Sequence, residues 1–291
     1  MCWICEASST IPGRLFTNCA RSAWWRNHRI SHEAYVEALA NSGKNLPALF
    51  EHVTGLRLEC VTIDALHALD LGLAGHIVAN ILWETVIQHK WGKPSIEQNV
   101  EILDANLRAW QKTKKTQRPL QGKLTKERLR SDSGYPKLKA KGAQTRYLAE
   151  YALYIAKLYD TGSVHDRRKV AVAQQLCRLY ELMRISSQFF SPEAAEEFKE
   201  VGQSMVAIYS TLYVEAHSQG KRLWKFPPKA HMVDHMVTYQ AKEWGNPSYC
   251  WCYSDEDLVG LSVEIAKACH PNTMAITAIV KWLLLAFDQE D

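Results

Sequence analysis

The chain has 291 residues, of which 47% are hydrophobic and 23% are charged. These proportions are typical of a soluble globular protein, and the length is sufficient for one large domain or two small ones. No apolar run reaches the roughly 18 residues that a membrane span needs. The longest run, residues 275–287, is interrupted by Lys281 and predicts a buried terminal helix. We therefore expect no membrane association, and the first residues show no signal peptide.

The cysteine content and the charge distribution indicate what kinds of site and partner to expect. Eight cysteines without a secretory segment indicate reduced thiols or metal ligands rather than a disulfide framework. The net charge is only +4, but residues 108–146 contain thirteen Lys or Arg residues and two acids, a local charge of +11 that leaves −7 for the rest of the chain. Such asymmetry points to a polyanion partner.

The chain opens with a Cys-x-x-Cys motif at Cys2 and Cys5. This spacing places two thiolates on one tight turn, as in a zinc knuckle, and supplies half of a tetrahedral site. The candidates for the other half are Cys19 with His28 or His32, and Cys250 with Cys252. The alternative is a pair of buried structural thiols.

The segment 61–81 joins a predicted strand to a predicted helix. Its start is short and rich in β-branched residues, which favours a buried strand over 57–63. Four side chains that can bind a metal or move protons follow, namely Asp64, His67, Asp70 and His76. The alternative is that Asp64 caps the helix while His67 donates to a neighbouring carbonyl. Short strands are also expected near 14–17 and 248–252, and a short helix over 32–42.

A basic segment follows the apolar stripe of a predicted helix over 96–110. Lysines in loops can follow phosphates without reading base sequence. The candidate nucleic-acid contacts are Lys112, Lys114, Lys115, Arg118, Lys123, Lys126, Arg128, Arg130, Lys137, Lys139 and Lys141. The alternative is a solvated, partly disordered insert. From 143 to 217 the pattern is almost unbroken helix, with a strong helix start at Ser191-Pro192.

Residues with potential chemistry return after position 225. Two prolines predict a helix start, and His231 and His235 then share one helical face at i and i+4, which suits a pair of metal ligands. The Glu of the familiar zinc-protease motif is missing, which excludes that class. Three acids, residues 255–257, open a further helix, where the helix dipole stabilises them, and one of them is expected to face a cation.

Four motifs in this order resemble those of the CACTA-type (En/Spm and Tnp2-like) DNA transposases. They are Cys2-x-x-Cys5, Asp64-x-x-His67 followed by Leu71-Gly72, Pro-Lys-x-His231 with His235, and Trp251-x-Tyr253-x-x-Glu256-x-x-x-Gly260. The matching regions cover roughly residues 1–76 and 225–287. The basic and helical middle of the chain shows no motif that can be aligned.

The resemblance implies an RNase H-like core with a helical insertion before the last acidic residue. Three carboxylates would hold two divalent cations, Mg²⁺ or Mn²⁺, that cut and rejoin DNA by in-line displacement. It implies that Glu256 is the third carboxylate and that Asp64 and His67 form the aspartate–histidine signature. The first two catalytic aspartates would lie upstream of Cys2, so we expect a fragment or truncated descendant that is incomplete by itself. The Glu-Arg pair of the family is Glu256-Asp257 here, which removes a positive charge beside the metal.

The expected architecture is therefore mainly α with a small β component, a partial RNase H-like core interrupted by a large helical insertion. Its regions are a Cys-x-x-Cys region (1–60), a strand–helix core (61–110), a basic and helical insertion (111–224) and a C-terminal part of the core (225–291). The candidate metal ligands are Glu256 for Mg²⁺ or Mn²⁺, the Cys2–Cys5 pair for Zn²⁺, and the His231–His235 pair.

Two functions from different classes remain open at this stage. The first is a DNA-binding fragment of a transposase, competent in strand transfer only if the missing aspartates are supplied. The second is a non-enzymatic helical nucleic-acid-binding or adaptor protein, a domesticated transposon remnant. Either one predicts DNA as partner, homo-oligomers and a nuclear location, or otherwise a cytoplasmic one.

Overall fold

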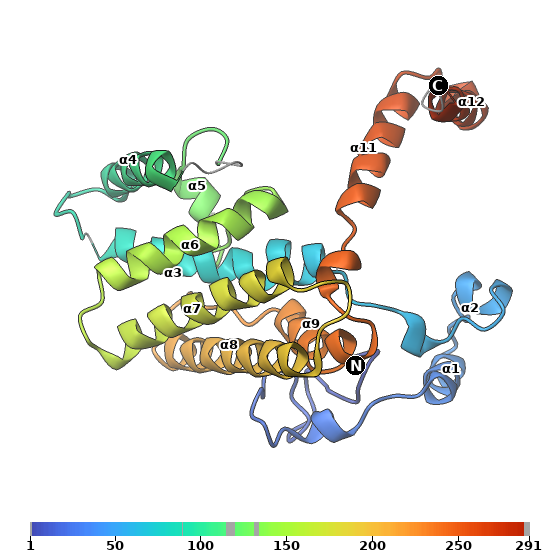
Figure 1. The fold of residues 1–291 in the computed structure, drawn as a ribbon, viewed down its shortest axis with the longest axis horizontal. Coiled ribbons are helices and arrows are strands. Elements are labelled where there is room, and N and C mark those ends of the chain that lie inside the picture. Colours follow the sequence, from blue (N-terminus) through green and yellow to red (C-terminus); the bar gives the residue numbers. More distant parts are fainter. Residues whose placement is uncertain (1, 89, 115–119, 131–133, 288–291) are drawn as a thin grey trace. The chain divides into compact units, whose positions relative to one another are not determined.

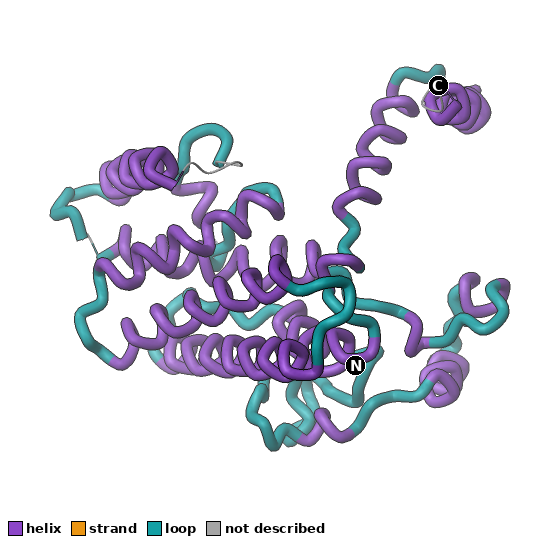
Figure 2. The backbone as a smooth tube through the Cα atoms, viewed as in Figure 1, coloured by secondary structure: helices purple, strands orange, loops and turns teal. Residues whose placement is uncertain are grey.

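The computed structural model describes residues 2–88, 90–114, 120–130 and 134–287; the side chains of Glu256 and of residues 285–287 are outside this description. The regular structure within these ranges is helical (Figures 1 and 2). The chain divides into two compact units, Met1–Cys250 and Trp251–Asp291.

The first unit holds most of the helices. Its α-helices are α1 (His32–Asn41), α2 (Ala48–His52), α3 (Gly75–Ile87), α4 (Ile96–Lys114), α5 (Lys126–Leu129), α6 (Gly142–Leu158), α7 (Val164–Ile185), α8 (Pro192–Ser218), α9 (Pro228–His235) and α10 (Ala241–Glu243). Short 3₁₀ turns are η1 (Trp24–Asn27), η2 (Leu58–Cys60) and η5 (Pro247–Tyr249), and π-helical segments are η3 (Leu66–Ala74) and η4 (Met236–Gln240).

The centre of this unit is the helical segment Leu66–Ile87, which comprises η3 and α3 and is kinked at Gly72, where φ is −100° and ψ is −108°. Among the described residues it is the one helix long and apolar enough to cross a membrane, but 89% of its most apolar window is buried inside the protein. Helix α6 and helix α9 contact it, and α7 lies between α6 and α8 in a layered stack (Figure 1). The apolar length of this segment therefore forms the core of the helical stack.

Serine caps set the starts of three helices. The Ser31 side chain accepts a hydrogen bond from the third residue of α1, Ser163 does so for α7 and Ser191 for α8. Each satisfies a backbone N–H that the first helical turn leaves unpaired. The helix expected over 32–42 and the helix start at Ser191-Pro192 are both confirmed.

The strands expected near 14–17, 57–63 and 248–252 are not formed, and the described residues contain no sheet (Figure 2). Two isolated bridges, Cys5 with Arg29 and Ser8 with Leu15, are all the β pairing they show. The prediction of a small β component and a partial RNase H-like core is therefore wrong, and the described fold is all-α.

In the β-branched run that predicted a strand, the backbone groups of Ile63 form hydrogen bonds with a side chain and not with a neighbouring strand. The amide oxygen of Gln240 accepts a hydrogen bond from Ile63 N at 2.6 Å, and its NH₂ group donates to Ile63 O at 3.0 Å. These bonds satisfy the buried backbone of Ile63 without a ladder. The residues just before it form the 3₁₀ turn η2.

The second unit contains α11 (Tyr253–Lys267), the 3₁₀ turn η6 (Pro271–Thr273) and α12 (Met274–Phe287). The two helices contact each other, and Trp282 Nε1 donates to Ser262 Oγ at 3.1 Å. The apolar run in α12 was expected to be buried. Its side chains are instead largely exposed, with 74% of Ile276 and 61% of Leu284 accessible to solvent. The prediction of a buried terminal helix is therefore wrong.

Candidate metal centre

The N-terminal Cys-x-x-Cys turn is held in the geometry of a zinc knuckle. The backbone N–H of Ile4 donates to Cys2 Sγ at 3.4 Å, and that of Ala7 donates to Cys5 Sγ at the same distance. The turn is closed by a hydrogen bond from Cys2 N to Ala7 O at 3.1 Å. Amide donors aimed at sulfur stabilise negative charge there, which a thiolate ligand requires.

Helix α9 supplies the other half of the site. Pro227 and Pro228 start the helix, so His231 and His235 stand one turn apart on one face. Both imidazoles are 1% exposed, Cys5 is fully buried and Cys2 is half-buried. This places two thiols and two imidazoles, from residues up to 233 positions apart, around one point.

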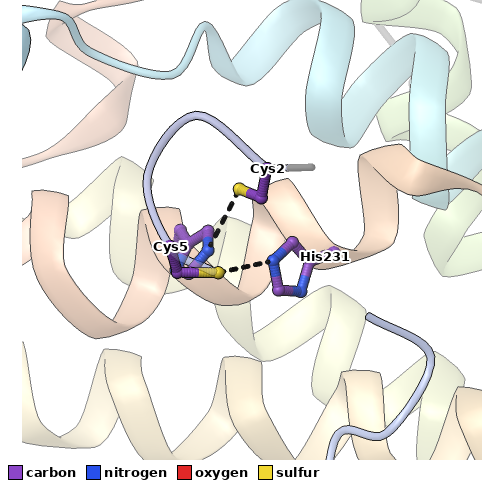
Figure 3. A group of neighbouring side chains, drawn as sticks. Cys2, Cys5 and His231 are labelled. Carbon is purple, nitrogen blue, oxygen red and sulfur yellow. Dashed lines mark hydrogen bonds between the residues drawn. The ribbon is translucent and has the colours of Figure 1, made fainter. Parts of the chain in front are cut away.

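The distances fit a tetrahedral zinc ion. Cys2 Sγ lies 3.6 Å from His235 Nε2, and Cys5 Sγ lies 3.3 Å from His231 Nε2 (Figure 3, where Cys2, Cys5 and His231 are labelled). All four donor atoms lie within 4.8 Å of one another. Tetrahedral zinc, with Zn–S about 2.3 Å and Zn–N about 2.0 Å, requires sulfur–nitrogen separations of about 3.6 Å. Soft sulfur and imidazole nitrogen are also the donor set that zinc prefers.

The two thiols are electrostatically coupled. A hydrogen bond from Cys5 lowers the pKa of Cys2 to about 2, and the same interaction raises the pKa of Cys5. Burial lowers the pKa of His235, which favours the neutral imidazole. A thiolate beside a neutral imidazole is the protonation state in which these groups bind a metal, and metal binding displaces the remaining thiol proton.

Aromatic side chains orient the imidazoles. Trp25 packs edge-on against His231 at 4.4 Å and against His235 at 5.3 Å between ring centroids, and Tyr239 stacks on His235. The Nδ1 atoms of both histidines are buried and have no hydrogen-bond partner among the described residues. Metal-bound histidines usually donate this N–H to a carboxylate or carbonyl. Here the orientation of the two imidazoles is set by packing against Trp25 and Tyr239 and not by such a hydrogen bond.

A buried ion pair connects the same two parts of the chain. Arg26 donates from both terminal nitrogens to Asp234, with Nη1–Oδ1 at 2.7 Å and Nη2–Oδ2 at 2.5 Å. The side chains are 8% and 0% exposed. Asp234 also accepts from Thr238 Oγ1 at 3.1 Å. The N-terminal segment is therefore attached to α9 by four candidate metal ligands and by a bidentate ion pair.

The completing ligands that the sequence offered lie elsewhere. Cys19 is buried outside the cluster, and this burial raises its pKa. His28 Nδ1 lies 2.7 Å from Trp24 O, and His32 Nδ1 accepts from Leu58 N at 3.1 Å. Cys250 is not part of the cluster, and Cys252 belongs to the second unit.

Asp64 and His67 form a helix-start motif. One carboxylate oxygen of Asp64 accepts from Leu66 N at 3.0 Å, and the other accepts from His67 N at 3.0 Å and lies 2.5 Å from His67 Nδ1. Asp64 therefore caps the helix as the alternative expected, whereas the partner of His67 is the Asp64 carboxylate and not a neighbouring carbonyl. Glu256 is a residue of α11, but its side chain is outside the described part, so no metal geometry can be assigned to it.

The other two acid–base candidates of this segment make structural contacts. Asp70 is 1% exposed and accepts from Arg146 Nη2 and from Tyr180 OH, both at 2.6 Å. His76 Nδ1 lies 2.9 Å from Pro136 O, and burial lowers the pKa of His76 to about 4.

The basic residues divide into two groups. Lys126 pairs with Glu97, Arg128 donates to the carbonyls of Gln121 and Lys123, and Arg130 donates to Gly134 O. Lys115 and Arg118 lie outside the described residues. The exposed candidates are Lys112, Lys114, Lys123, Lys137, Lys139 and Lys141.

Comparison of the chain with protein-family models, with curated proteins and with solved structures gave no match. The resemblance to CACTA-type transposases therefore stays a prediction.

Proposed function

We propose that this chain is a non-catalytic helical module built around a structural zinc ion, and that it binds nucleic acid. The observation that carries the first part is the convergence of Cys2, Cys5, His231 and His235. Four protein ligands fill a tetrahedral zinc ion and leave no open position for water or substrate, which is the mark of a structural site. The proposed role of the ion is to hold the N-terminal segment on α9.

Cobalt substitution tests the coordination directly. The purified protein, freed of metal under reducing conditions and titrated with Co²⁺, is expected to show sulfur-to-cobalt charge-transfer bands and intense visible bands of tetrahedral Co²⁺ at one equivalent. Cys5→Ser and His231→Asn are expected to weaken these bands strongly. Cys60→Ser, at an exposed cysteine outside the cluster, is the matched control. Weak octahedral bands in the parent protein would contradict the proposal.

The nucleic-acid part of the proposal is supported by the exposed lysines of the basic segment. Six of the nine candidates that the structure describes are exposed, and the segment carries a charge of +11. Binding by such a surface is electrostatic, so affinity for a labelled DNA is expected to fall linearly with the logarithm of salt concentration. Absence of salt-dependent binding would reject this part and leave the zinc proposal untouched.

Strand transfer is not included in the proposal. The resemblance places the catalytic carboxylates on an RNase H-like core, and the described residues form no sheet. A Mg²⁺ or Mn²⁺ site, homo-oligomers and a nuclear location stay predictions from the sequence.

A further inference from the structure

An extended segment presents lysines at every second position. Lys137 N and Lys139 N donate to the carbonyls of Leu129 and Arg128 at the end of α5, whereas Leu138 N donates to Gly75 O at 3.0 Å on the opposite side. Leu138 is buried, and Lys137, Lys139 and Lys141 are exposed. Alternate residues of an extended chain are about 6.6 Å apart and share one face. Lys137 and Lys139 therefore share one face of this segment, and exposed Lys141 follows the bend at Ala140 as the residue that precedes α6.

Two lysines from a distant part of the sequence flank the first end of this segment. Lys225 Nζ lies over the ring of Tyr135 at 5.9 Å from its centroid. The Lys229 side chain runs along η3 at Gly72, where a Cβ would stand 3.1 Å from its Cδ. We call Lys137, Lys139, Lys141, Lys225 and Lys229 the basic rail.

The flanking lysines are held by buried contacts. Trp224, just before Lys225, has a left-handed backbone with φ of 53°. Its N–H donates to Asn80 Oδ1 at 2.7 Å, its indole donates to buried Glu84, and Tyr209 OH donates to Lys225 O at 2.6 Å. Buried side chains therefore hold the main chain on both sides of the Trp224–Lys225 peptide bond.

The rail carries positive charge that the protein does not neutralise. In the described part of the chain, no carboxylate lies within ion-pair distance of Lys137, Lys225 or Lys229. Lys137 and the carboxylate of Asp64 both lie close enough to Lys229 to act on it electrostatically. Ammonium groups held close together gain free energy from an anionic partner.

We infer that the basic rail binds the phosphate backbone of a single nucleic-acid strand, with successive phosphates along Lys137, Lys139 and Lys141 and with Lys225 and Lys229 gripping the phosphates at the Lys137 end. This inference rests on the nucleic-acid part of the proposed function. A row of charges matches a row of phosphates, whereas a free phosphate or a single lipid headgroup would occupy one end only. Contacts from lysines to phosphates carry no base-sequence information, so we expect the rail to bind without reading sequence.

The test measures the salt dependence of binding to a fluorescein-labelled single-stranded oligonucleotide between about 50 and 200 mM salt. In the full chain, Lys137→Gln with Lys225→Gln and Lys229→Gln is expected to reduce the slope of log K against log salt by about 2, since each lost phosphate contact on a single strand removes about 0.7. Replacement of the same three residues by Arg is expected to retain the slope. Circular dichroism checks that both variants are folded.

The matched control carries the same change of charge elsewhere, at the exposed residues Lys44, Lys221 and Lys242, and is expected to leave the slope unchanged. Equal losses in the two triple Gln variants would show that net charge alone drives binding and would overturn the rail, while leaving the proposed nucleic-acid function standing. No binding by the parent protein would overturn both. Parent binding to vesicles of anionic lipid that equals binding to the oligonucleotide, and that the rail variant loses, would overturn nucleic acid as the occupant.

Discussion

Removal of zinc from the proposed Cys2–Cys5–His231–His235 site is expected to lower the melting temperature of the protein by roughly 10 °C. A ligand present at a thousand times its Kd stabilises the folded state by about 4 kcal/mol, and in a unit of this size each kcal/mol shifts the midpoint by about 2–4 °C. The measurement is a thermal melt of reduced protein with and without a chelator. Restoration of the midpoint by added zinc separates metal loss from a direct effect of the chelator.

The same experiment identifies the part of the molecule that the metal holds. The N-terminal segment has a small core of its own, formed by Cys5, Ala7, Ala23 and Trp25, whereas the helical stack has a large one. Limited proteolysis is therefore expected to cut first in residues 2–30 of the metal-free protein. Cys5→Ser is expected to behave like the metal-free form, and Cys60→Ser like the parent. Identical melts with and without chelator, in a protein that contains zinc, would contradict a structural role.

Arg26→Met is expected to destabilise the protein by about 3–5 kcal/mol, because it leaves the carboxylate of Asp234 buried without its partner. The Asp234 side chain is fully buried, and Thr238 is its other hydrogen-bond donor. The free energy of unfolding from urea titration measures this loss. Combining Arg26→Met with Asp234→Asn is expected to recover much of it, since no unpaired charge then remains.

An exposed ion pair provides the control for this variant. Arg57 and Glu33 lie 2.8 Å apart with 49% and 67% of their side chains exposed. Arg57→Met is expected to cause no measurable change, because solvent screens exposed pairs. Zinc content is measured in every variant, so that loss of the ion pair is not confused with loss of the neighbouring metal. A small effect of Arg26→Met with zinc retained would show that water reaches Asp234.

Local signals predicted the helices well because their causes are local. Ser191 followed by Pro192 determines the start of α8 from two adjacent residues. The strand expected over 57–63 had a local signal as well, but its outcome depended on Gln240, a side chain 177 positions away. Sequence pattern alone does not reveal which distant group will satisfy a short backbone segment.

The candidate metal centre also combines local signals with a contact between distant parts of the chain. The spacing of Cys2 and Cys5, and that of His231 and His235, each identified a pair of ligands, because each pair lies on one turn or one helical face. The two pairs come together only in the tertiary structure, from positions more than 220 residues apart. The sequence held one clue that was missed. A structural zinc ion takes four ligands, so each pair lacks two, and the two pairs together make a complete set.

The same logic explains the basic segment. Its charge is visible in the sequence, but Arg128 and Arg130 donate hydrogen bonds to nearby carbonyls. Lys225 and Lys229, which lie outside the segment in sequence, belong to the same proposed surface. Charge counting along the chain therefore identifies only part of the proposed basic rail.

The separation of the two ligand pairs has a consequence for biosynthesis. Cys5 leaves the ribosome 226 residues before His231, and at 5–20 residues per second the interval lasts roughly 10–45 s. During that time the nascent chain offers two reactive thiols that can hold a metal only weakly or become oxidised. In the proposed zinc site, synthesis of α9 therefore completes the coordination of two cysteines that were made much earlier.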